Sequence, residues 1–412
     1  MNLLKKSRLG ELIEVTRGAS LSGEYYSTKG EYIRLTCGNF DYHNNCFKEN
    51  TSKDNLFYTG EFREEFLLEK GDIITPLTEQ AIGLLGTTAR IPKSGKYIQS
   101  QDIALVKCKA GKIDPTFCYY LISSRLVRNQ LSAAAQQTKI RHTSPDKIKA
   151  CTVWIPELDE QITIGRLLAS LDDKIHLNKR INDNLEAMAK QLYDYWFVQF
   201  DFPNEEGKPY KSSGGAMVWN EKLKREIPQE WSDCKLKDFI NLFDSKRVPL
   251  SSKDRGERQG VYPYYGATGI MDYVNDYIFD GDYILLAEDG STSDAKGFPI
   301  VQYIWGKNWV NNHAHIILPK NERYMMFTYQ MLRSIPAKQI ETGSIQKKIS
   351  QENLCGYKMV LPNSNLLEKY ENVVSPLWEK RKRCIEEINT LTKQRDELLP
   401  LLMNGQASVN SD

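Results

Sequence analysis

Two loops of this 412-residue chain combine basic and amide side chains in a way that suits contact with nucleic acid. Lys139 and Arg141 lie in a loop of the first half, and Gln346, Lys347 and Lys348 lie in a loop of the second half. Lysine and arginine neutralise phosphates or donate to guanine, and glutamine bonds adenine through both atoms of its amide. The alternative interpretation is a solvated polar loop that contacts no ligand.

A second set of candidates for DNA contact consists of basic, amide, histidine and aromatic residues near predicted strands and turns. Packing in the core or in a turn would explain the tyrosines of this set equally well. The set comprises Arg17, Arg34 and Asn39 in the first half, and Lys246, Arg247, Tyr264, Tyr265, Asn311 and His313 in the second half.

The chain lacks the motifs of an enzyme that acts alone on DNA. There is no G-x-x-x-x-G-K-[ST] phosphate loop, no Gly-rich turn for S-adenosylmethionine, and no Asp/Asn-Pro-Pro-aromatic motif to hold a target base. His313 and His315 alternate on a predicted strand and so share a face, but no third metal ligand is evident. We therefore expect no catalytic residue, no bound metal and no cofactor on this chain.

Composition indicates an ordinary globular protein that stays in the cytoplasm. The 55 basic and 53 acidic residues leave a net charge of +2, which neither favours nor excludes a nucleic-acid partner. No run approaches the roughly 18 apolar residues of a membrane span, and the amino terminus turns polar too early for a signal peptide. None of the eight cysteines forms a C-x-x-C pair, which argues against a zinc site and favours reduced thiols.

The element that must position these loops is a long helix in the middle of the chain. Residues 166–201 contain neither Gly nor Pro, so the helix could run about 35 residues, or about 50 Å. Steps of four and three place one seam along a single face of this helix. The seam consists of Leu171, Ile175, Asn178, Asn182, Leu185, Ala189, Leu192 and Trp196.

The second half of the chain repeats the first at an offset of 206 residues, so that Pro156 corresponds to Pro362. At the same offset, the seam of the central helix corresponds to a seam on a second charged helix near the carboxyl terminus. The basic loop of the first half likewise corresponds to the basic loop of the second half. Pro376 could kink that helix. The repeated seam consists of Leu377, Arg381, Cys384, Ile388, Leu391, Arg395, Leu398 and Leu402. The predicted segments are a strand-rich domain at 1–155, a helix at 156–203, a linker with a second strand-rich domain at 204–362, and a helix at 363–412.

Two helices that each follow their own domain can pair through their leucine seams. An antiparallel pair would separate the two domains and relate them by a pseudo-two-fold axis. The 26 residues from Leu171 to Trp196 would span about 39 Å, against the 34–36 Å or so between half-sites one turn of B-DNA apart. The polar seam residues Asn178 and Asn182 would set the register or face a partner.

This arrangement resembles the specificity subunit of type I restriction-modification systems. In the second half the resemblance rests on five stretches, and it covers essentially the whole chain. The stretches are Ile227-Pro-x-x-Trp231, Tyr262 to Gly269, Glu288-Asp-Gly-Ser291, Asn311-Asn-His-Ala-His315 and Thr342 to Ser350. The first half departs from it: it has no Pro-x-x-Trp entry, and Thr78-Glu-Gln80 stands where the second half has Glu288-Asp-Gly290.

The resemblance implies an α+β fold with two different target-recognition domains, and hence an asymmetric, bipartite site in double-stranded DNA. It implies docking of two modification subunits that supply S-adenosylmethionine-dependent adenine methylation. Where restriction subunits accompany them, those would supply ATP- and Mg2+-dependent cleavage. Two other classes stay open on the residues alone: a free-standing nuclease, and a coiled-coil scaffold whose domains never touch DNA.

Overall fold

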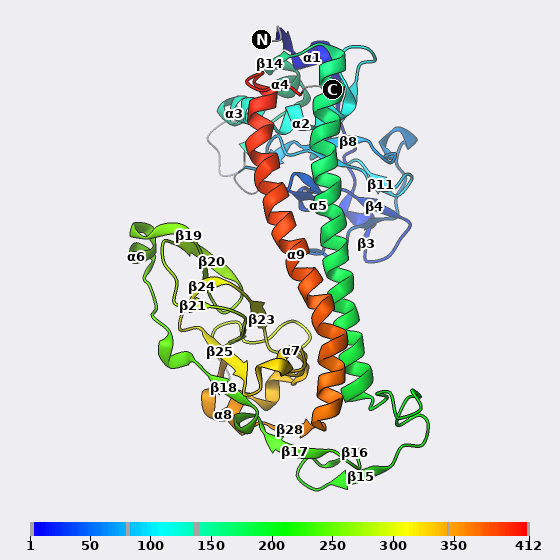
Figure 1. Cartoon of the computed structure of the whole chain (residues 1–412). Helices are drawn as coiled ribbons and strands as arrows, with labels where there is room; N and C mark the ends of the chain where they lie inside the picture. The colour runs from blue at the N-terminus through cyan, green and yellow to red at the C-terminus, as the bar shows by residue number, and fades with distance from the viewer. Residues whose placement is uncertain (1–3, 80–82, 135–140, 344–345, 410–412) are drawn as a thin grey trace. The chain divides into compact units, whose positions relative to one another are not determined.

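The computed structural model describes residues 4–79, 83–134, 141–343 and 346–409 (Figure 1). The chain divides into two compact units, one made of residues 1–178 and 386–412 and the other of residues 179–385. Each unit combines helices with strands, which confirms the predicted α+β class. Across these described ranges, every helix is too short or too polar to cross a bilayer.

The first unit is organised around a four-stranded sheet in the order β10-β8-β12-β2. Its central strand β12 (Ile103–Cys108) begins with four consecutive buried residues, as expected for a strand covered on both faces. A second sheet has the order β11-β4-β7-β3. The other strands are β1 (Lys5–Arg8), β2 (Ile13–Arg17), β3 (Tyr26–Ser27), β4 (Tyr32–Arg34), β5 (Phe40–Asp41), β6 (Cys46–Phe47), β7 (Phe57–Tyr58), β8 (Ile73–Pro76), β9 (Thr78–Glu79), β10 (Ala89–Arg90), β11 (Tyr97–Ile98), β13 (Arg141–His142) and β14 (Thr152–Ile155).

Short helices cover the first unit's sheet. The Asp114 carboxylate accepts from the backbone of Thr116 and Phe117, and Pro115 occupies the first helical position, so α2 begins where the sequence predicts. The predicted helix does not continue unbroken to Leu131, because Ser124 adopts an extended conformation and divides it. The helices are α1 (Leu9–Leu12), α2 (Pro115–Ser123), α3 (Arg125–Ala134) and α4 (Pro145–Ala150).

The second unit repeats this design with one sheet in the order β18-β25-β22-β23 and another in the order β20-β19-β24-β21. Its strands are β15 (Met217–Asn220), β16 (Arg225–Pro228), β17 (Ser232–Lys235), β18 (Ile240–Leu242), β19 (Gln259–Tyr265), β20 (Ile270–Val274), β21 (Phe279–Asp280), β22 (Tyr283–Ala287), β23 (Val301–Ile304), β24 (Lys307–Val310), β25 (Ala314–Pro319), β26 (Glu341–Thr342), β27 (Lys348–Ile349) and β28 (Lys358–Leu361). Its helices are α6 (Ser252–Glu257), α7 (Met325–Ser334) and α8 (Gln351–Gly356).

Backbone hydrogen bonds define which residues of the two units are equivalent. Leu77 accepts from the amide of Thr143 and donates to the carbonyl of Asp102, while Glu288 accepts from Ile349 and donates to His313. Leu77 is thus the counterpart of Glu288, and the next residue, Thr78, is the counterpart of Asp289. The match of Thr78 with Glu288 suggested by the sequence is therefore wrong by one residue.

Two long helices, α5 (Leu158–Tyr193) and α9 (Ser364–Met403), contribute to both units. In the first unit Asp172 contacts Arg395 and Asn178 contacts Glu387, so the two segments run antiparallel (Figure 1). The segments in the second unit are also antiparallel, because Glu186 contacts Arg381 and Ala189 contacts Tyr370. Because both helices are shared, the compact units differ from the four predicted segments, whose boundaries stay a prediction.

The predicted seam residues lie on the inward faces of these helices. Leu171, Leu192, Leu377, Ile388 and Leu398 are half-buried, whereas Ile175, Leu185, Trp196, Leu391 and Leu402 are buried. After Tyr193 the helix widens into a π-helical turn, Asp194–Val198, which brings Trp196 against the ring of Tyr370 at 5.7 Å between centroids. The helix α9 continues through Pro376.

Candidate nucleic-acid interface

Three segments of the second unit meet beside the ends of two buried strands. Glu288 and Asp289 follow β22, Asn311 to His313 precede β25, and Lys348 lies on β27, which pairs with Asp289 as an isolated bridge. The Glu288 amide donates to the His313 carbonyl at 2.8 Å, and the Ile349 amide donates to the Glu288 carbonyl at 2.8 Å. Strand pairing thus brings together candidates from distant parts of the sequence.

The cations at this junction are paired with carboxylates. Glu288 accepts from Arg247 at 2.7 Å and forms an ion pair with Lys348 at 3.2 Å, while Lys347 forms an ion pair with Glu341 at 2.8 Å. Burial by itself raises the pKa of Glu288, but the Arg247 hydrogen bond and the neighbouring positive charges outweigh it and lower that pKa. A DNA phosphate would therefore have to compete with these carboxylates for the two lysines.

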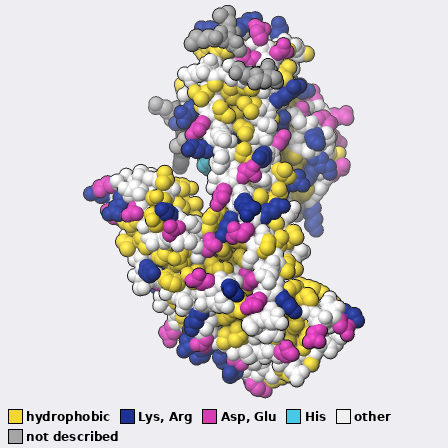
Figure 2. Space-filling model, in the orientation of Figure 1, with side chains coloured by type: hydrophobic (Ala, Val, Ile, Leu, Met, Phe, Trp, Pro, Cys, Tyr) yellow, Lys and Arg dark blue, Asp and Glu magenta, His cyan; other side chains and the backbone are white. Residues whose placement is uncertain are grey.

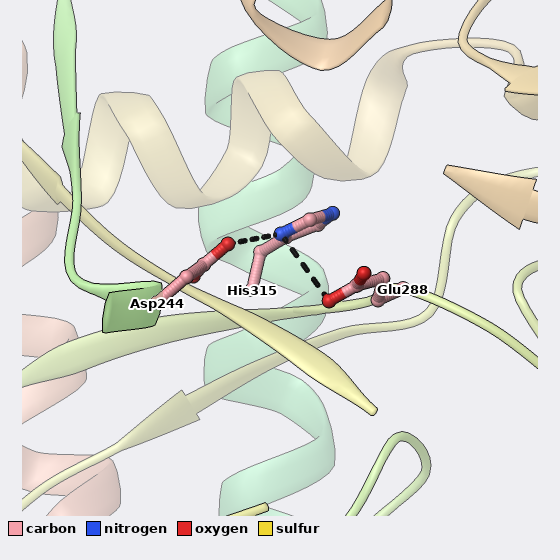
Figure 3. A group of neighbouring side chains, drawn as sticks. All are labelled: Asp244, Glu288 and His315. Carbon is pink, nitrogen blue, oxygen red and sulfur yellow. Dashed lines mark hydrogen bonds and ion pairs between the residues drawn. The ribbon is translucent and has the colours of Figure 1, made fainter. Parts of the chain in front are cut away.

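Beneath these residues lies a buried cluster of Asp244, Glu288 and His315 (Figure 3). His315 is fully buried, and its Nδ1 lies 2.6 Å from Asp244 Oδ2 and 3.8 Å from Glu288 Oε2. Its Nε2 lies 2.7 Å from the carbonyl oxygen of Ile349. Asp244 also accepts from the Ile316 amide at 2.9 Å and from the Gln351 side chain at 2.6 Å.

The geometry of this cluster suits a shared proton better than a metal ion. Ligand atoms bound at 2.0–2.1 Å to a tetrahedral zinc lie about 3.3 Å apart, whereas Nδ1 of His315 and Oδ2 of Asp244 are 2.6 Å apart. Arg247 and Lys348 already pair with Glu288, so a divalent cation would have to displace them. The residues do not fit a metal, and His313, which the sequence placed on one face with His315, is not part of the cluster and pairs with Asp289 instead.

The equivalent junction of the first unit has the same pattern of backbone hydrogen bonds but different side chains. Arg141 on β13 lies 3.7 Å from Glu79, and His142 on the same strand pairs with Thr78. The Thr78 hydroxyl donates to Asp102 at 3.1 Å. In the second unit the counterparts of Thr78 and Asp102 are Asp289 and His313, which lie 2.6 Å apart.

Comparison with known proteins identifies the family. Residues 1–187 and 228–369 match the family model described as "Type I restriction modification DNA specificity domain". This chain belongs to that family. The MjaIX specificity subunit of Methanocaldococcus jannaschii is 24% identical over 314 residues, which cover 71% of this chain and 69% of that subunit. A putative specificity subunit of Haemophilus influenzae is 33% identical over 142 residues, 34% of this chain and 35% of its own length.

A solved structure shares the fold. The crystal structure of the S subunit of a type I restriction-modification system from M. genitalium superposes with a TM-score of 0.62 at 18% identity, over 98% of this chain and 96% of that one. The predicted family is confirmed, and with it the prediction of a specificity subunit for DNA recognition with two target-recognition domains.

Several predicted contact residues instead support the recognition domains from inside. The Tyr264 hydroxyl accepts from the Leu250 amide at 2.9 Å within a buried cluster, and burial raises the pKa of the half-buried Tyr265 to about 12. Asn311 is buried and accepts from the His313 amide at 2.8 Å. Tyr264 and Asn311 thus shape the surface without reaching it, and their prediction as DNA contacts is corrected, whereas the half-buried Tyr265 stays a predicted contact.

The same correction applies to Arg34 and Asn39 of the first recognition domain. The guanidinium of Arg34 lies 3.8 Å from the Tyr26 ring centroid and donates to the Asn55 carbonyl. Asn39 accepts from the Thr36 amide at 2.9 Å in the cap of a short helical turn. Both side chains are buried and serve the fold.

The remaining predicted contacts are accessible. Lys139 lies outside the described residues. Lys and Arg side chains are interspersed with Asp and Glu over the visible face of each recognition domain (Figure 2). The exposed or half-buried candidates are Arg17, Arg141, Lys246, Arg247, His313, Gln346, Lys347 and Lys348.

Sequence reasoning missed the carboxylates that organise these cations. Asp244 stands three residues before Arg247, and Glu79 stands in the first recognition domain at the end of β9. Each accepts backbone amides as well as charged partners: Asp244 from Ile316, and Glu79 from Gly83 at 2.7 Å and Leu84 at 3.1 Å. For Asp244 the available signal was an acidic residue close to the basic candidates Lys246 and Arg247, whereas Glu79 has no basic residue beside it in the sequence.

Proposed function

We propose that this specificity subunit reads an asymmetric, bipartite sequence in double-stranded DNA, with one half-site for each recognition domain. The chain itself is non-catalytic and acts in the cytoplasm of a prokaryote. It docks two modification subunits, which methylate adenine with S-adenosylmethionine. Where two restriction subunits join them, those subunits use ATP and Mg2+ to cleave DNA.

The observation that supports an asymmetric target is the pair of equivalent junctions. The two domains share the strand order of the sheet that carries these junctions, and the backbone hydrogen bonds beside it. Yet Thr78, Asp102 and His142 in one domain stand where Asp289, His313 and Lys348 stand in the other. Hydroxyl, carboxylate and imidazole groups differ in what they donate and accept, so the two surfaces would favour different base edges.

Partner docking is supported by exposed apolar side chains of the second unit, on α5 and on the π-helical turn that follows it. Met188 is 47% exposed and Tyr195 is 38% exposed. Exposed apolar side chains of this kind suit contact with helices of partner subunits.

Footprinting of the complex with its modification subunits tests the proposal. We expect two protected patches on DNA separated by an unprotected spacer, with different sequences in the two patches. A partner-bound complex that protects no DNA would establish the scaffold instead. Metal-dependent cleavage by the purified chain alone would establish the nuclease.

A further inference from the structure

The fully buried His315 joins the two basic segments of the second recognition domain. Its Nδ1 contacts Asp244, which opens the segment that carries Lys246 and Arg247. Its Nε2 contacts the carbonyl of Ile349, the residue after Lys348. His315 is therefore a direct link between these segments, in addition to the Glu288 carboxylate, which pairs with both Arg247 and Lys348.

Both ring nitrogens of His315 face groups that can only accept a hydrogen bond. The backbone carbonyl of Ile349 has no proton to give, and the Asp244 carboxylate already accepts from the Ile316 amide and the Gln351 side chain. The pKa of Asp244 is lowered, so this carboxyl is ionised, and acceptor atoms at 2.6 and 2.7 Å from the ring then require a proton on each nitrogen. The side chain is thus an imidazolium.

Two carboxylates lie close to this buried charge and stabilise it. Asp244 and Glu288 carry the negative charge, Arg247 and Lys348 carry positive charge beyond them, and Cys355 on α8 is the further titratable group near Asp244. Burial opposes protonation, but the hydrogen bond and charge of Asp244 outweigh it and raise the pKa of His315. Loss of the proton would place a lone pair against a carboxylate and weaken the link.

The first recognition domain has no counterpart of this link at the same strand position. His315 is the second residue of β25 and pairs with Leu286, whereas Ala104 is the second residue of β12 and pairs with Thr75. A methyl group cannot bridge two segments. Each molecule therefore contains one domain with the imidazolium and one that serves as an internal control.

We propose that His315, as an imidazolium, is a positioning residue that holds segments 244–247 and 346–349 in one arrangement for reading the second half-site. This rests on the proposed function, because it assumes that the second domain contacts DNA. The residue acts through the segments it joins and does not itself reach the surface.

Hydrogen exchange of the full chain without DNA tests the link itself. In the wild type, exchange of the Ile349 amide, corrected for intrinsic pH dependence, should accelerate about tenfold or more as pH rises through the pKa of His315. The Ile349 amide of His315→Gln should exchange at the fast rate at every pH, whereas in His176→Gln, which changes an exposed histidine of the first unit, it should behave as in the wild type. The Thr143 amide of the first domain should not respond in any of them. An Ile349 amide whose protection is flat with pH in the wild type overturns the proposal, whether or not the variant folds.

Footprinting at several pH values tests the consequence for DNA. With modification subunits present, protection of the second half-site should weaken as pH rises, while the first half-site stays constant, and His315→Gln should remove this difference. A parallel response of both half-sites overturns the positioning role. Complete absence of protection at every pH, with the exchange result intact, overturns the proposed function and leaves the link standing.

Discussion

The side-chain amide of Asn178 on α5 donates to the carboxylate of Glu387 on α9, with 2.8 Å between nitrogen and oxygen. Lys174, one turn earlier on α5, forms an ion pair with the same carboxylate. A buried asparagine that bonds across a helix pair favours the one register in which its partner is opposite. This contact supports the register-setting interpretation of Asn178 over the partner-facing one.

Replacement of Asn178 with Ala should lower the free energy of unfolding by about 1 kcal/mol, because the variant cannot form this side-chain hydrogen bond in a buried position. Urea denaturation of the full chain measures this. Asn184→Ala, at an exposed position of the same helix, is the matched control and should stay within about 0.5 kcal/mol of the wild type. Equal effects of the two substitutions would contradict the assignment.

Replacement of Asp172 with Ala should cost more, about 3 kcal/mol, because it strips a buried arginine of a partner. Asp172 accepts from Arg395 at 2.9 Å and from the Tyr120 hydroxyl at 2.7 Å. The neighbouring Asp173 is exposed, so Asp173→Ala should change the unfolding free energy by less than about 0.5 kcal/mol. Denaturant titrations of both variants check the difference, and a mild Asp172→Ala would show that the pair is solvated.

Glu371 should make stability fall as pH rises. Burial raises its pKa from 4.5 to about 7, although it accepts from the amides of Met326 and Phe327 and from Ser375. Because the folded pKa exceeds the unfolded one, the protonated form stabilises the fold below pH 4.5, and this contribution disappears as pH rises through 7. Relative to Glu371→Gln, the wild type should lose about 3 kcal/mol between about pH 4.5 and 8.

Denaturation at a series of pH values measures that difference. Glu368→Gln, at an exposed site on the same helix, should follow the wild-type curve. If Glu371→Gln also runs parallel to the wild type, the carboxyl is not the source of the pH dependence.

Replacement of Lys347 and Lys348 together with Ala should weaken DNA binding by the partner-bound complex and flatten its salt dependence. For each phosphate that the variant no longer neutralises, the slope of log affinity against log salt should fall by about 0.9. Lys222→Ala with Lys224→Ala is a matched control, because those lysines are also exposed and paired with carboxylates. An unaltered slope in the first double variant would mean that this loop does not contact phosphates.

Insertion of one helical turn beside Lys179, matched by one turn beside Ile385 on α9, should lengthen the spacer between the half-sites. A turn adds about 5.4 Å, which corresponds to about one or two base pairs. Sequencing of methylated sites in a host carrying the variant reads the spacer directly. An unchanged spacer would refute the idea that the helix pair sets the distance.

The repeated fold could be predicted because its signals, the leucine spacing and the internal repeat, can be recognised directly in the sequence. Leucines at steps of four and three indicated both helices, and the 206-residue offset indicated that the second domain repeats the first. The break at Ser124 carries no Gly or Pro and was not foreseen. The helix α9 continues through Pro376 because the freed carbonyl belongs to Asn372, which is exposed and can bond water.

The site was less predictable because it depends on contacts between distant residues. Lys347 and Lys348 were found from their loop alone, but their carboxylate partners, Glu341 and Glu288, could be recognised only once the strands were paired. Tyr264 and Arg34 have polar side chains of the kind that often contact ligands at a surface, but tertiary packing buries both. A single sequence cannot separate a polar residue that supports a turn from one that reaches a ligand.

The hydrogen bonds between each domain and its long helices have a consequence for evolution. Tyr120 brings a hydroxyl to Asp172, and the start of α7 brings two amides to Glu371. In both cases the helix supplies the carboxylate and the domain supplies the donor. A foreign domain recombined into this frame must therefore bring a donor to the same place, or the carboxylate keeps only its partner on the helices, Arg395 for Asp172 and Ser375 for Glu371. The contacts with the helices thus limit which recognition domains, and hence which DNA specificities, the gene can acquire by recombination.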